Sequence, residues 1–202
     1  WRAAFYTAYG FKDGQIKYGF EARKMFNRDN RFTIGIGTRR DVMQLGAQLT
    51  TDEGIMTRSF ASSGVLNSGN NFNLSSVNQT SAFAAIDPFK NFTVRLDATY
   101  QTIKSANPTK FSLDFYQNNQ LFSELKDSKL ALSITARPGA KFSRYGVDRY
   151  EHSTLAPTFV LKYTRGLEGV FNADFNYNKL QFYYYQPFLL KSFGRLILNV
   201  EA

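Results

Sequence analysis

The chain has 202 residues, no cysteine and a formal net charge of +9. The lack of cysteine argues against a disulfide-stabilised secreted module and against a zinc module built on thiolates. Its basic residues are scattered, and the densest groups are the pairs Arg23-Lys24 and Arg39-Arg40. Because a nucleic-acid interface needs a basic patch or tail, we expect no nucleic-acid partner.

The hydrophobic residues, 43% of the chain, are finely mixed with polar ones. No run of about 18 apolar residues occurs, so the sequence predicts no transmembrane helix. The dominant signal is a two-residue alternation, which places successive side chains on opposite faces of a β-strand.

The first alternating run covers residues 16–23. Ile16, Tyr18, Phe20 and Ala22 alternate there with Lys17, Gly19, Glu21 and Arg23. Turn residues lie on both sides of this run, at Gly10–Gly14 and Asn27–Asn30. The pattern predicts a hairpin-connected strand with one apolar and one polar face.

Residues 52–80 interrupt this rhythm. They are rich in Ser, Asn and Gly, as in NSGNN and NLSS. A segment of this composition buries too little apolar surface to order itself. We therefore predict a long, exposed loop over 52–80.

The clearest strand is predicted over residues 91–102, NFTVRLDATYQT. Phe92, Val94, Leu96, Ala98 and Tyr100 form its apolar face, and Thr93, Arg95, Asp97, Thr99 and Gln101 form its polar face. Strands of soluble proteins are typically about 5–6 residues long. This run reaches the roughly 9–11 residues that cross a bilayer at a tilt, so we predict that its apolar face contacts lipid.

The later part of the chain repeats the pattern over 130–137, 159–164 and 195–201, with a second, more charged loop predicted over 138–156. About ten such strands indicate an all-β protein: an antiparallel transmembrane β-barrel with meander connections, as a single domain over residues 1–202. Trp1 begins inside an apolar run and Ala202 follows an alternating strand without a turn. We therefore expect a partial barrel, a fragment of a longer chain whose first and last strands do not pair.

The search for a chemical site gives no catalytic, cofactor-binding or metal-binding residues. His152 is followed by Ser153, but adjacent side chains on an extended strand point to opposite faces and cannot form a catalytic relay. The acidic residues are dispersed, and no metal-binding motif occurs. We predict a protein that is not an enzyme and has no cofactor.

Polar residues on the predicted inner face are the remaining candidates. They are Arg95, Asp97, Lys162, Arg165 and Glu201. In a narrow lumen these side chains would pair as a stabilising ladder, whereas in a wide lumen they would set the selectivity of a pore.

Two stretches of the chain resemble a known family. Residues 9–46, with YGFKDGQIKYGFEARKMF and RRDVMQLG, and residues 157–202, with PTFVLKYTRGLEGVFNADFNYNKLQFYYYQPF and FGRLILNVEA, are similar to the C-terminal barrels of large Bacteroidota surface proteins that begin with a carboxypeptidase-regulatory-like domain. Residues 157–202 also resemble, less closely, strands of the surface-antigen barrels that insert or export proteins across the outer membrane. Arg165-Gly166-Leu167 lacks the aromatic residue of their Arg-Gly-aromatic signature, so the resemblance carries over no functional residue.

Together these features predict a non-enzymatic integral β-barrel of the bacterial outer membrane, in a Gram-negative member of the Bacteroidota. We expect a component of a protein assembly or export complex at the cell envelope, whose partners are outer-membrane lipid, lipopolysaccharide and other envelope proteins. The alternative is a solute pore or nutrient-uptake barrel. A phospholipase-like membrane enzyme and a soluble β-sandwich binding module are further alternatives.

Overall fold

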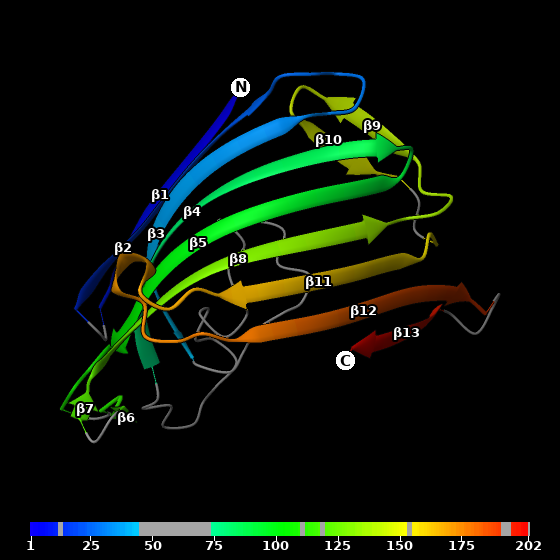
Figure 1. The fold of residues 1–202 in the computed structure, drawn as a ribbon. Helices are drawn as coiled ribbons and strands as arrows, with labels where there is room; N and C mark the ends of the chain where they lie inside the picture. Colours follow the sequence, from blue (N-terminus) through cyan, green and yellow to red (C-terminus); the bar gives the residue numbers. More distant parts are fainter. Residues whose placement is uncertain are drawn as a thin grey trace.

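The computed structural model describes residues 1–11, 14–44, 74–109, 112–117, 120–152, 155–190 and 195–201. Nine strands form one antiparallel sheet (Figure 1). They are β1 (Arg2–Gly10), β2 (Gln15–Met25), β3 (Thr33–Gln44), β4 (Leu74–Phe89), β5 (Phe92–Ser105), β8 (Glu124–Ala136), β11 (Thr158–Gly166), β12 (Asn178–Leu189) and β13 (Arg195–Glu201). The predicted all-β, antiparallel meander is confirmed.

Two short hairpins and a 3-10 turn complete the described elements. They are β6 (Phe115–Gln117) with β7 (Gln120–Phe122), β9 (Phe142–Tyr145) with β10 (Asp148–Glu151), and η2 (Val170–Asn172). The two hairpins lie at opposite ends of the curved sheet, because one lies in the connection from β5 to β8 and the other in the connection from β8 to β11 (Figure 1).

The strands follow one another in the sheet in chain order, from β1 at one edge to β13 at the other. No backbone pairing within the described ranges joins β1 to β13, so this part of the chain forms an open, curved sheet. No helix among the described residues has the length and apolar character needed to span a membrane.

The outer face of the sheet is apolar along rows that cross several strands. One such row of register partners runs from β3 to β12: Ile34, Ala84, Leu96, Leu132, Tyr163 and Leu180. The Leu96 residue at its centre is 49% exposed. Large apolar side chains of this face are exposed along the whole sheet, among them Phe5, Ile16, Phe20, Ile36, Leu161, Phe182, Leu198 and Val200.

The inner face is polar and more tightly packed. One row of register partners consists of Arg95, Ser133, Lys162 and Gln181, on four neighbouring strands. Three glycines on this face each lie under an aromatic ring of a neighbouring residue: Gly19 under Tyr6, Gly35 under Phe83, and Gly166 under Tyr177. A Cβ at any of these positions would clash with the ring, so the absent side chain makes room for it.

Two sequence predictions need correction. Residues 74–80, predicted as the end of a loop, form the first half of β4, while residues 52–73 lie outside the described residues. The buried residues at the start of β4 are Ser75, Ser76 and Val77. Two of them are small and polar, so this part of the strand lacks the alternation of apolar and polar side chains by which strands were predicted. The predicted loop over 138–156 instead contains the β9–β10 hairpin; its residues 153 and 154 lie outside the described residues.

Candidate functional site

The inner face brings together part of the predicted polar set. The Arg95 guanidinium forms an ion pair with Asp97, with Nη2 2.7 Å from Oδ1, and it stacks on the Phe83 ring, with Cζ 3.8 Å from the ring centroid. Lys162 lies in the same cross-strand row as Arg95, with Ser133 between them. Arg95 and Lys162 therefore share one cross-strand row, whereas Asp97, opposite Ala131, lies in another.

Arg165 does not belong to this set. It is the register partner of Leu130 and lies two positions from Tyr163 on β11, so it is on the outer, apolar face and is exposed. Its assignment to the inner face is therefore wrong, and two-residue counting from Phe159 already places it outside. The structure describes only the backbone of Glu201, which pairs with Tyr183.

The main polar assembly lies where the β9–β10 hairpin meets the sheet. Asp148 of β10 joins two arginines of the first two strands: Oδ2 is 2.6 Å from Arg2 Nη1, and Oδ1 is 2.9 Å from Arg23 Nη2. The Asp148 side chain is 18% exposed. Register pairing also puts Arg2 opposite Arg23, and such like charges repel unless an anion lies between them. Asp148 therefore both docks the hairpin and relieves this repulsion.

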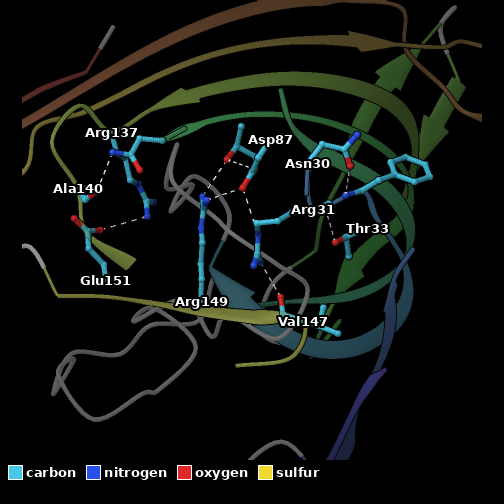
Figure 2. Close-up of polar contacts among 12 residues, drawn as sticks. Asn30, Arg31, Thr33, Asp87, Arg137, Ala140, Val147, Arg149 and Glu151 are labelled. Carbon is cyan, nitrogen blue, oxygen red and sulfur yellow. Dashed lines mark hydrogen bonds and ion pairs between the residues drawn. The ribbon is translucent and has the colours of Figure 1, made fainter. Parts of the chain in front are cut away.

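A second carboxylate, Asp87 of β4, holds the centre of the assembly (Figure 2). Its Oδ2 accepts a hydrogen bond from Arg149 Nη1 at 2.8 Å and lies 3.3 Å from Arg31 Nε. Its Oδ1 accepts a hydrogen bond from the Thr93 hydroxyl at 2.7 Å, and Arg149 also donates to Thr93. Arg31 Nη2 donates to the Val147 carbonyl, 2.9 Å away. The Asp87 carboxylate thus links the sheet, the β2–β3 turn and the β9–β10 hairpin.

The base of the hairpin is tied by further contacts. Asn91 Nδ2 donates to the Ala140 carbonyl at 2.9 Å, and the backbone N–H of Arg137 donates to the Asn91 carbonyl at 2.8 Å. Arg137 Nη1 lies 3.5 Å from Glu151 Oε2 (Figure 2). The hairpin is therefore anchored at its turn, its middle and its base.

A cavity of about 710 Å³ lies beside this assembly. We call it the hairpin cavity; its lining is residues 29–31, 87–91 and 140–142 with Arg144 and Arg149. Five of the lining residues are cations and two are carboxylates. The lining is therefore basic.

The backbone around the hairpin cavity is irregular. Arg31 and Asn91 both have positive φ, 53° and 63°. Asn tolerates this left-handed region, whereas for most other L-residues it costs about 1–2 kcal/mol. The pairing of β4 with β5 shifts register between Ile86 and Phe89, which marks a β-bulge at Asp87. Bulges and strained residues concentrate near functional sites.

The electrostatic environment of Arg31 is unusual for an arginine. Burial lowers the pKa of its guanidinium, the nearby Arg149 and Arg144 cations lower it further, and Asp87 acts in the opposite direction. The Arg31 side chain is only 12% exposed, and its Nη1 is buried without a hydrogen-bond partner. The cavity thus contains a cation whose charge the surrounding protein does not fully compensate.

The one histidine does not build a catalytic relay in the described chain. His152 Nε2 contacts the Ser143 hydroxyl on the exposed side of the hairpin. A serine hydrolase needs a third group that orients the imidazole, and within the described ranges no carboxylate bonds to the other ring nitrogen of His152. Those ranges also contain no group of His, Cys, Asp or Glu that could hold a metal ion.

A smaller polar contact lies at the opposite end of the sheet. Tyr177, just before β12, donates its hydroxyl hydrogen bond to Asp127 Oδ1 at 3.2 Å. Burial raises the pKa of Tyr177, and the adjacent Asp127 carboxylate raises it further. The contact holds the Tyr177 ring over Gly166.

The sequence analysis missed the assembly around Asp87. Asp87 and Arg149 are 62 positions apart, and Arg31 and Val147 are 116 positions apart. Arg149 is visible in the sequence as part of a charged segment, but no spacing rule connects it to Asp87. The Asp87-Pro88 pair inside an otherwise regular strand was the available signal, because proline within a strand points to an edge or a bulge.

A family model described as the C-terminal domain of a family of unknown function (DUF5686) matches residues 1–202. No curated protein and no solved structure matches the chain.

Proposed function

Because this chain belongs to the DUF5686 family, as its C-terminal domain, we propose a function for that domain. It is a non-enzymatic β-barrel wall in the outer membrane of a Gram-negative bacterium of the Bacteroidota. It works within a complex that assembles or exports proteins at the cell envelope. Its partners are outer-membrane lipid, lipopolysaccharide and other envelope proteins, and a carboxypeptidase-regulatory-like domain accompanies it in the family.

The observation that carries this proposal is the exposed apolar outer face. Monomeric soluble proteins rarely expose contiguous apolar patches above a few hundred Å². Here, apolar register partners continue from Ile34 on β3 to Leu180 on β12, with Leu96 and Leu132 between them. A lipid environment accounts for such a face, because it removes the cost of exposing apolar side chains to water.

Aromatic side chains near both ends of the strands support the same environment. Phe89 and Phe92 are in edge contact at the β4–β5 turn, with centroids 6.1 Å apart. Tyr9 and Phe11 are in edge contact where β1 ends, with centroids 5.4 Å apart. Membrane barrels have two aromatic girdles, one at each interface. The two pairs lie at opposite ends of the strands, which fits that arrangement.

The β9–β10 hairpin favours a scaffold over an open pore. Its three carboxylate contacts, through Asp87, Asp148 and Glu151, fix it against the inner face at one end of the sheet. In addition, the described sheet has two edge strands, and an open edge has no hydrogen-bonding partner in lipid. A wall completed by further strands satisfies these edges, which supports a role inside a larger assembly.

Two experiments test the proposal. Membranes from cells that make the intact protein are extracted with alkaline carbonate, and the protein is followed by immunoblotting; we expect it to stay in the membrane pellet. Cross-linking in intact cells followed by mass spectrometry is expected to identify other envelope proteins at β1 or β13. Release of the protein into the soluble fraction would contradict the membrane assignment, and recovery without envelope partners would contradict the assembly role.

The solute pore is the second candidate, and the inner-face row favours it. Arg95, Ser133, Lys162 and Gln181 form a polar row on that face, as a water-filled path requires. Conductance in planar bilayers separates the two functions. The scaffold predicts no stable ion-conducting steps, whereas a pore predicts steps whose anion preference falls when Lys162 is replaced by Gln.

A further inference from the structure

We propose that the hairpin cavity is a binding site for a small phosphorylated ligand, whose phosphoryl oxygens contact the exposed cations Lys90 and Arg144 of the lining. This inference does not depend on the export role proposed above. It rests on the charge, size and backbone of the cavity itself.

The first step is the charge of the lining. The cations are Arg31, Lys90, Lys141, Arg144 and Arg149, and the carboxylates are Asp29 and Asp87. Cations therefore outnumber carboxylates among the lining residues. A cavity lined by one sign of charge attracts ligands of the opposite sign.

Asp87 cannot compensate this excess any further. Thr93 donates to its Oδ1, and its Oδ2 lies against both Arg149 and Arg31. Two guanidinium groups therefore share a single carboxylate, which leaves one positive charge at this point uncompensated. An anion that enters the cavity completes the arrangement.

The donor chemistry favours phosphoryl oxygens. Guanidinium groups are planar forks of N–H donors, which suit the several oxygens of a phosphoryl group. Lys90 and Arg144 line the cavity and are exposed, so ligand oxygens meet cationic donors there. The volume of about 710 Å³ fits a small molecule rather than a macromolecule.

The backbone gives an independent reason to assign function here. Arg31 keeps a long charged side chain at φ 53°, where glycine is the residue without strain. Asn91, in the β4–β5 turn, is also in the left-handed region, and both residues line the cavity. Strain of this kind persists where the side chain has a use. The two strained residues therefore mark the cavity as a candidate functional site.

The test uses pyrophosphate as the probe. The intact protein is purified in detergent and titrated with pyrophosphate by isothermal calorimetry at low and at physiological salt. We expect one saturable site per chain. Arg144→Gln is the first variant, because this exposed side chain can change without disturbing the fold; its dissociation constant is expected to rise about tenfold, the loss of one charge-assisted hydrogen bond.

A second variant and a matched control keep the test decisive. Lys90→Gln removes a second exposed cation of the lining, so it is expected to weaken binding while its thermal unfolding temperature changes little. Arg165→Gln removes a guanidinium from the outer face and is expected to bind as the unaltered protein does. Absence of saturable binding, or equal weakening by Arg144→Gln and Arg165→Gln, would overturn the proposal.

The source of the phosphoryl group is decided by competition. The same titration is repeated in nanodiscs that contain phosphatidylglycerol and in nanodiscs of zwitterionic lipid alone. Weaker pyrophosphate binding only in the anionic nanodiscs identifies a lipid head group as the natural ligand. Equal binding in both identifies a soluble phosphorylated compound. Either result supports the site, while the loss of saturable binding in both nanodiscs would overturn it.

Discussion

The outer and inner faces of the same sheet are built by different rules. The outer face repeats one kind of contact, in which apolar side chains such as Leu96 and Leu132 lie opposite each other on neighbouring strands. The inner face depends on particular partners that are far apart in the sequence, such as Asp87 with Arg149. Apolar character alone is enough to build the outer face, whereas the inner face needs particular side chains at particular positions. Substitutions on the two faces should therefore destabilise the protein by different mechanisms.

The largest effect is expected when a charge enters the outer face. Leu96→Arg should lower the free energy of unfolding by about 2–4 kcal/mol if the position lies near the bilayer midplane. The measurement is urea unfolding in lipid vesicles. Thr99→Arg, on the inner face of the same strand, is the control and should cost clearly less. Equal losses for the two variants would mean that the faces do not differ in environment.

The next effect tests the close packing of the inner face. Gly35→Ala introduces a Cβ against the Phe83 ring and should cost about 1–3 kcal/mol, as overpacking does. Because Phe83 also carries the stacked Arg95 guanidinium, the ring cannot move freely. In a Phe83→Ala background the same substitution should cost much less. If the cost stays the same in that background, the ring is not its cause.

A smaller and more local effect is expected at the hairpin. Asp148→Asn removes the carboxylate between Arg2 and Arg23 and should cost about 1–2 kcal/mol, because two partly exposed cations lose their partner. Hydrogen exchange of the amides in 142–151 measures the loosening. Glu151→Gln is the comparison: its contact with Arg137 is longer, at 3.5 Å, whereas Asp148 lies 2.6 and 2.9 Å from two arginines, so the Glu151 pair should contribute less than about 1 kcal/mol. Faster exchange in Glu151→Gln than in Asp148→Asn would reverse this ranking.

The same contrast explains what could be predicted from the sequence. Strand alternation is local, so it predicted β2, β5, β8 and β11 and the face of Leu96. It failed for residues 74–80, because a strand with small polar residues on both faces has no hydrophobic alternation to detect.

The candidate site was largely beyond sequence reasoning. Arg95 and Asp97 are two positions apart on one strand, and they form an ion pair in the structure. Arg31, Asp87 and Arg149 meet only because the hairpin folds back onto the sheet. Arg165 was misplaced although two-residue counting gives its face, since a charged residue was assumed to avoid the apolar side.

The smallest effect concerns pH at the far end of the inner face. The folded protein raises the pKa of Tyr177 above its ordinary value, through burial and Asp127. The folded state therefore holds this proton more tightly than the unfolded state, and the free energy of unfolding should fall as pH rises above about 10. The chain has 12 tyrosines, so the ultraviolet titration of the protein minus that of Tyr177→Phe isolates this phenol. Asp127→Asn should move its ionisation toward lower pH; an unchanged titration curve would exclude the carboxylate as a cause.

The most direct test of the two-face account is cysteine labelling on β5. The chain has no cysteine, so a single cysteine at position 95 or 96 reports on one face without background. The protein is placed in lipid vesicles and treated with a thiol probe confined to the hydrocarbon phase. The account predicts modification at position 96 and protection at position 95; modification at 95 with protection at 96 would contradict it.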